Sequence, residues 1–196
     1  MKKSGTVRAP SPLPTSRRAA LAALATLPLA LAACQEPGGT HLMGIGDPIR
    51  GAAISAPQTF GNMSRFNGRP AEAAEAAAQL EFLASAMPAH PRYQTSVQPT
   101  VFMQLTRARA EMRDAIGIRA DAPADPVIAA LRTAAAALRD GNLQRARVAL
   151  TTSDFLNPPD VTLQRLGSLP RLPRSAEAAG GVAIAIQNLG IRNRGM

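Results

Sequence analysis

From Pro70 onward, prolines and glycines divide the sequence into segments whose apolar residues recur at helical spacing. In the first segment, about residues 70–87, such residues lie three and four apart on one helix face: Ala73, Ala76, Leu80, Leu83 and Met87. Pro70 suits the first helical position, and Pro88 is expected to end the helix. Strands favour β-branched and aromatic residues, but only 3% of this chain is aromatic. The sequence therefore predicts an all-α fold.

Further helices are predicted over about 99–116, 126–139, 143–153, 160–166 and 176–189. Three of them have expected caps, namely Asp125, Asn142 and Ser175, and three have expected glycine stops, namely Gly117, Gly167 and Gly190. Gly180 and Gly181 are expected at a close helix–helix contact. We expect a small antiparallel bundle of about four main helices plus one or two short ones, with a core that includes Leu80, Leu83, Leu105, Met112, Leu131 and Leu138.

Residues 34–69, called the tether below, differ from the rest because they are rich in glycine and proline. A short helix is predicted over 48–55, begun by Asp47 and Pro48. We expect residues 35–46 to be mobile and residues 47–69 to pack on the helices for at least part of their length, because the later part carries many apolar groups. These are Ile49, Ile54, Phe60, Met63 and Phe66.

The N-terminal segment, residues 1–33, has the pattern of an export signal. A basic stretch containing Arg17 and Arg18 precedes a weakly apolar run over 19–31, which is too short to span a bilayer as a helix. The run ends in Leu31-Ala32-Ala33-Cys34. This sequence resembles the lipobox of bacterial lipoproteins: an aliphatic residue, two small residues and the cysteine that receives lipid.

The resemblance implies cleavage before Cys34 and a mature chain over residues 34–196, anchored by two or three acyl chains, palmitate among them. The resulting division is a removed signal peptide over 1–33, the lipidated tether, a helical domain over 70–191 and a tail over 192–196. Cys34 would carry covalent lipid and no other cofactor.

Two features of the signal leave alternatives open. Arg17 and Arg18, followed by Leu21, also resemble a twin-arginine export signal, whereas the general secretory route needs only a positive flank. Gln35 follows the cysteine where some bacteria use Asp to retain lipoproteins in the inner membrane. We therefore expect a lipid-anchored protein facing the periplasm, with the outer membrane favoured over the inner.

The net charge of +9 suggests nucleic acid, but its distribution does not. Five of the 22 basic residues lie within 1–33, a segment that contains no acid; the remaining 17 face 13 acidic residues. We therefore expect no nucleic-acid partner. Two arginine groups are interpreted either as solvated mixed-charge faces or as contacts to anionic envelope polymers or lipid phosphates. They are Arg107, Arg109 and Arg113, with Glu111 and Asp114 placed as ion-pair partners, and Arg145 with Arg147.

No motif for catalysis or metal binding is found. His41 and His90 lie apart in the sequence, and the carboxylate pairs Glu72/Glu75 and Glu111/Asp114 lack the Glu-x-x-His element of di-metal bundles. Residues 138–146 resemble the hairpin of a tetratricopeptide repeat, but the chain shows no second copy. We expect a non-enzymatic envelope lipoprotein that binds another envelope protein. The alternatives are a carrier for an apolar small molecule and a tetratricopeptide-like protein-binding hairpin.

Overall fold

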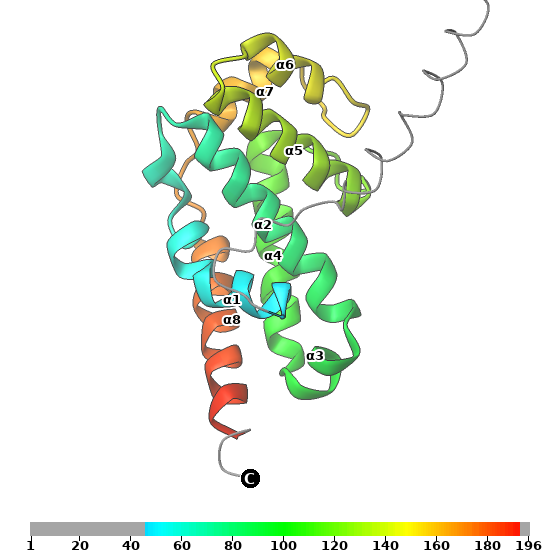
Figure 1. Ribbon diagram of the computed structural model, residues 1–196, viewed down its shortest axis with the longest axis vertical. Coiled ribbons are helices and arrows are strands. Elements are labelled where there is room, and N and C mark those ends of the chain that lie inside the picture. The colour runs from blue at the N-terminus through cyan, green and yellow to red at the C-terminus, as the bar shows by residue number, and fades with distance from the viewer. Residues whose placement is uncertain (1–45, 193–196) are drawn as a thin grey trace, which may run out of the picture. The chain divides into compact units, whose positions relative to one another are not determined.

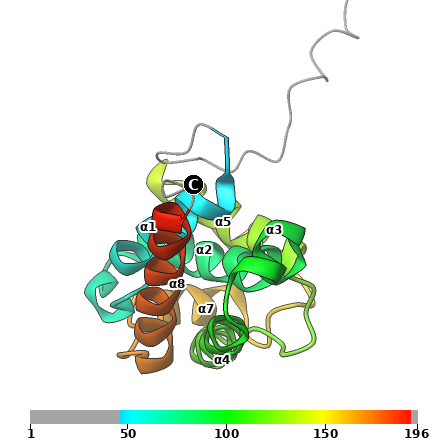
Figure 2. The same cartoon turned by 90° about the horizontal axis from the view of Figure 1, so that it is seen from below.

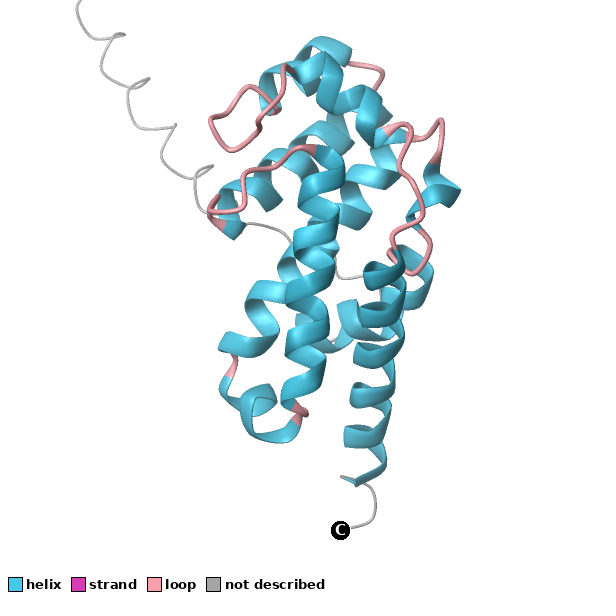
Figure 3. Cartoon of the chain, turned by 180° about the vertical axis from the view of Figure 1, so that it is seen from behind, coloured by secondary structure: helices cyan, strands magenta, loops and turns pink. Residues whose placement is uncertain are grey.

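The structure is a computed structural model that describes residues 46–192, and these are mostly helical (Figure 1). In chain order the elements are α1 (Pro48–Thr59), the 3₁₀ helix η1 (Met63–Phe66), α2 (Pro70–Ala89), α3 (Pro91–Ser96), α4 (Pro99–Ile116), α5 (Ala124–Arg139), α6 (Leu143–Ala149), α7 (Pro159–Leu166) and α8 (Pro173–Arg192). None of the described residues belongs to a strand (Figure 3). The all-α prediction is confirmed, and α2, α4, α5 and α8 are the four long helices.

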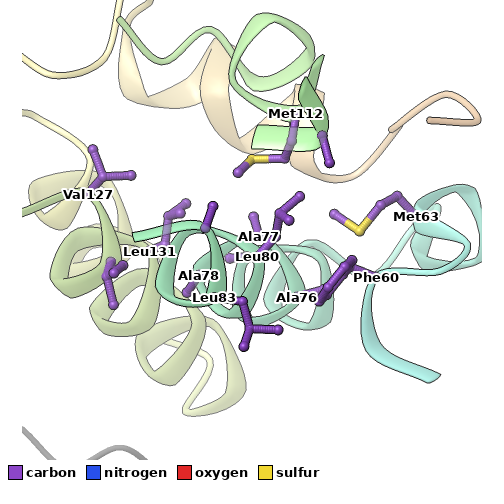
Figure 4. Close-up of a cluster of buried hydrophobic side chains, with 14 of the residues drawn as sticks. Phe60, Met63, Ala76, Ala77, Ala78, Leu80, Leu83, Met112, Val127 and Leu131 are labelled. Carbon is purple, nitrogen blue, oxygen red and sulfur yellow. The ribbon is translucent and has the colours of Figure 1, made fainter. Parts of the chain in front are cut away.

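Helix α2 is the centre of the bundle. It packs against α1, α4 and α5, and it also contacts η1, α3 and α7 (Figure 2). Figure 4 shows the result: Phe60 and Met63 lie on one side of α2, Met112 of α4 on another, and Leu131 of α5 on a third. Five alanines of α2 outside the predicted face are buried too, since their small side chains let neighbouring helices approach from several directions: Ala71, Ala74, Ala77, Ala78 and Ala84. The helix is therefore not amphipathic, although its sequence spacing suggests one inner face.

Helices α4 and α8 pack antiparallel. The Gln104 side chain donates to Glu177 Oε1 at 2.9 Å, and further along α4 the Glu111 carboxylate accepts from the Ser175 amide at 3.0 Å. Gly181 lies at this contact: a Cβ there would come within 2.4 Å of Gln104 Oε1, whereas one on Gly180 would meet nothing. The expected close approach is therefore confirmed at Gly181 alone.

Residues 47–66 belong to the same core as the later helices. Ile49, Phe60, Met63 and Phe66 are buried, which confirms the expected packing of part of this segment, whereas Ile54 is about half exposed. The segment is also more regular than expected. Helix α1 runs past Pro57 to Thr59. A proline lacks the backbone N–H, but in the last turn of a helix it removes few backbone hydrogen bonds, so the helix can continue to its end.

Several helix ends before residue 140 differ from the prediction. Pro88 lies inside the last turn of α2, and α3 occupies what was expected to be loop. Helix α5 begins at Ala124, which places Asp125 in its first turn and not at the cap. At the other end of α5, Leu138 is only partly buried, so it is not a full core residue.

Helix α8 is longer than predicted at both ends. It begins at Pro173, so Ser175 lies inside its first turn and not at the cap, and it runs through Gly190 to Arg192, so Gly190 is not a stop. Ser175 is nevertheless buried, with its hydroxyl hydrogen-bonded to Glu111. Among the described residues, neither α8 nor any other helix combines the length and the apolar character needed to cross a bilayer.

The α4–α5 connection is fixed by Gly117 and by a pairing with the loop after α6. Gly117 caps α4 at φ 89°, as expected for a glycine stop, and Ile118 behind it is buried. The Arg119 amide donates to Asp154 O and the Leu156 amide donates to Gly117 O, both at 2.8 Å. Because residues 154–156 pair with 117–119 and cannot continue a helix, α6 ends at Ala149, short of its predicted end.

Candidate functional site

The residues predicted to form an export and lipidation signal lie outside the described part of the chain. They are Arg17, Arg18, Leu31, Ala32, Ala33 and Cys34, and His41 lies outside it as well. The candidate sites that can be built from side chains are therefore those of the helical domain: two charged clusters and the exposed apolar residues.

The first charged cluster lies between α2 and α4. Glu81 is fully buried, and its carboxylate accepts three hydrogen bonds. Arg113 donates to it twice, through Nε to Oε1 at 2.5 Å and through Nη2 to Oε2 at 2.9 Å, and Arg109 Nε donates to Oε2 at 2.8 Å. Charges removed from water are tolerated here because the bidentate pairing and the third bond satisfy the carboxylate.

The same arginine also binds the α4–α5 connection. Arg113 Nη1 lies 3.0 Å from each of three backbone carbonyl oxygens, those of Arg119, Ala120 and Ala122. A rigid guanidinium can satisfy carbonyls and a carboxylate in several directions at once, which a lysine ammonium on a flexible stem does less well. The cluster therefore joins α2, α4 and the residues after Gly117.

This geometry corrects the prediction of an exposed basic face on α4. Arg113 is buried and Arg109 is turned toward Glu81, so only Arg107 of the three is exposed. Glu111 is not an ion-pair partner of these arginines: its carboxylate accepts from the amides of Arg174 and Ser175 at the start of α8. Sequence spacing alone could not reveal this, since the partners lie on other helices that are distant in sequence.

The second charged cluster joins the start of α1 to α3. Asp47 caps α1 by accepting from the Arg50 amide at 3.1 Å, and its other oxygen accepts a short hydrogen bond from the Tyr93 hydroxyl. Arg92 lies 3.4 Å from the same carboxylate oxygen. Tyr93 itself is almost completely buried, and the His90 ring packs beside it with the ring centroids 5.3 Å apart.

These contacts perturb both acids in the second cluster. Burial alone would raise the pKa of Asp47, but the hydrogen bonds from Tyr93 and Arg50 and the charge of Arg92 together lower it. For Tyr93, burial, the hydrogen bond to Asp47 and the negative charge of that carboxylate all raise the pKa above its ordinary value. A protonated tyrosine beside an ionised aspartate is a stable pair at neutral pH, and its effect is to fix α1 on α3.

Other predicted candidates have structural partners. His90 is exposed and caps α3, with Nδ1 accepting from the Arg92 amide at 3.3 Å. Glu75 pairs with Arg139 at 3.1 Å and Arg132 at 3.9 Å, and Arg147 pairs with Asp160 at 2.6 Å. Asn142 caps α6 as predicted. Within residues 46–192 no three His, Cys, Asp or Glu side chains are grouped as metal ligands.

Exposed apolar side chains are the feature that the sequence analysis missed. Four lie on or between α6 and α7: Leu143, Val148, Leu156 and Val161. Four others lie on α1, α4 and α8: Ile54, Met103, Ile184 and Ile191. The sequence could identify them only as apolar residues that do not lie on the predicted buried faces of the helices. Their distribution is important because large apolar groups at a surface often mark contacts with proteins or membranes.

Comparison with known proteins gave no match: no family model, no curated protein and no solved structure is similar to this chain.

Proposed function

We propose that the protein is a lipid-anchored envelope protein whose helical domain is a non-enzymatic interaction module. The observation that carries the proposal is the sequence Leu31-Ala32-Ala33-Cys34, which lies at the end of the apolar run and its basic flank. Helix α1 begins at Pro48, soon after Cys34 in the sequence. A folded domain that follows a lipidated cysteine so closely would be kept near the membrane.

The proposed mechanism is tethering. Two or three acyl chains on Cys34 would anchor the protein stably, where a single chain would exchange. Confinement to a surface raises the effective concentration of the domain toward partners on the same membrane. The domain would face the periplasm, and Gln35 after the cysteine favours the outer membrane over the inner one.

The proposed partner is another envelope protein. The charged groups of the domain support a protein partner better than a nucleic acid, because many arginines are already engaged with carboxylates; these include Arg92, Arg109, Arg113, Arg119, Arg139 and Arg147. The exposed apolar residues of α6 and α7 offer a surface that such a partner could cover. Leu143 and Val148 project from the second helix of the α5–α6 hairpin, which favours this hairpin as the binding element.

The anchor is tested by changing the proposed lipid acceptor. Cells expressing the wild-type chain, Cys34→Ala and the control Met43→Ala are grown with labelled palmitate, and the protein is then fractionated. We expect label and membrane retention in the wild type and the control, and neither in Cys34→Ala. Labelled Cys34→Ala protein that remains in the membrane as strongly as the wild type would refute the proposal.

A further inference from the structure

One end of the helical domain carries almost no acidic side chains. This end, called the α3 end below, consists of residues 46–51, 87–103 and 184–192, which include the start of α1, all of α3, the start of α4 and the end of α8 (Figure 1). The segments are joined by contacts: Tyr93 donates to Asp47, and Arg50 lies beside Gly190, where an added Cβ would come within 3.4 Å of Nη2.

Charge is distributed unevenly between this end and the rest of the domain. All acidic residues of the chain except Glu36 lie within 46–192, yet only Asp47 is at the α3 end, and it is engaged by Tyr93 and Arg92. The basic side chains that the structure describes there are those of Arg50 and Arg92. Helix α8 carries no charged residue between positions 178 and 191. Two of the three charged side chains described at this end are positive, so it carries a small net positive charge, which suits it electrostatically to anionic headgroups.

Apolar groups are exposed at the same end. Met103 is half exposed, Ile184 more so, and Ile191 is 70% exposed. Three prolines that begin helices are exposed there as well, namely Pro48, Pro91 and Pro99. Exposed apolar side chains and arginines on one surface are a combination with which proteins insert shallowly into a bilayer interface.

The position of the proposed anchor favours this end over the other. The chain from Cys34 to Asp47, fully extended, spans about 45 Å. Helix α7 lies near the start of α2, because the amide of Gly68, just before α2, donates to the carbonyl oxygen of Gly167, just after α7. Helix α3 follows the other end of α2, so α7 marks the end of the domain opposite the α3 end, called the α7 end. Helix α2, with 20 residues, is about 30 Å long. If the α7 end faced the membrane, the segment from Cys34 to Asp47 would have to span about this length, which is most of its extended reach.

We propose that the α3 end lies against the phospholipid surface that holds the anchor, so that α6 and α7 face away from the membrane. The proposal rests on the lipid anchor of the proposed function and adds the orientation of the domain. It commits to an anionic bilayer, with Ile184 and Ile191 at the depth of the headgroups and Arg50 and Arg92 beside the phosphates. The exposed residues of α6 and α7 are then directed toward a partner.

The sequence permits a direct test because it contains no tryptophan. Single tryptophans are placed at Ile191→Trp and, as a matched control, at Leu156→Trp, since the two positions are 70% and 68% exposed. Each full-length variant is purified with its lipid and reconstituted into phosphatidylglycerol vesicles with or without brominated acyl chains, which quench nearby tryptophan. Circular dichroism checks that both variants keep the wild-type helix content.

We expect brominated lipid to reduce the emission of Ile191→Trp and to leave that of Leu156→Trp unchanged. Flotation of the same vesicles reports the anchor separately. If the protein floats but Ile191→Trp is not quenched, or both positions are quenched equally, the orientation is wrong while the anchor stands; a protein or second copy covering the α3 end would give the unquenched result. If the protein does not float, the proposed anchor fails and the orientation fails with it.

Discussion

Replacing Glu81 by glutamine tests the energetic role of the buried ion cluster. The carboxylate accepts three N–H bonds, and the side chain of Arg113 is only 3% exposed. A glutamine has one acceptor oxygen, and its NH₂ group would face N–H donors. At least one arginine donor would lose its acceptor, and the Arg113 charge would stay buried without a counterion.

Breaking one partner of a buried pair costs about 3–5 kcal/mol, a large share of the roughly 5–15 kcal/mol by which domains are stable. For a domain of this size the loss lowers the unfolding midpoint by about 2–4 °C per kcal/mol, so we expect a decrease on the order of 10 °C. The measurement is thermal unfolding followed by circular dichroism, supported by a urea titration.

Glu75→Gln is the matched control, because it makes the same substitution in the same helix. Glu75 is about one-third exposed and pairs with Arg132 and Arg139 near the surface, so its loss should cost less than about 1 kcal/mol. Equal midpoints for the two variants would refute the reasoning, since they would mean that the buried cluster contributes no more than a surface pair.

Two further predictions concern the second cluster and the core. Tyr93 is the only tyrosine, so the ultraviolet titration of tyrosinate reports it alone; we expect the phenol to stay protonated well above pH about 10, and Asp47→Asn to lower its pKa. Because the pKa of Tyr93 is raised by folding, its contribution to the free energy of unfolding is intact below pH about 10 and is lost as the pH rises through the folded-state pKa. Because the pKa of Asp47 is lowered by folding, its contribution is lost in acid, below pH about 4. A tyrosine that titrates normally in the folded protein would contradict this. Leu105→Ala, at a fully buried site, should cost about 2–5 kcal/mol, and Met103→Ala in the same helix under about 0.5 kcal/mol; similar urea midpoints would show that the inner face of α4 is misassigned.

The elements could be predicted because local signals set them. Proline at the first helical position and glycine in the left-handed conformation act within one turn, so Pro70, Pro99 and Gly117 mark real boundaries. The inner face of α4 follows from spacing in the same way. Helix ends that depend on tertiary contacts could not be predicted in this way. Helix α6 ends early because residues 154–156 pair with 117–119. Helix α8 continues through Gly190, since nothing at that position requires a turn.

The charged clusters could not be predicted for a similar reason. Local spacing assigned Glu111 to the arginines of its own helix, but it binds the start of α8, and Arg113 pairs with Glu81 in another helix. Nor does the sequence distinguish an inner alanine from an outer one in a helix as rich in alanine as α2. The predicted lipidation signal is a different case, since it rests on the sequence alone and its residues lie outside 46–192, so it stays a prediction.

The intact mass of the protein extracted from membranes tests the central claim most directly. The account predicts a chain that begins at Cys34 and carries diacylglycerol on its sulfur, with or without a further acyl chain on the amino group. The Cys34 thiol should then be unreactive toward maleimide. A membrane-extracted chain that begins at another residue, or that retains a free thiol at Cys34, would contradict the account.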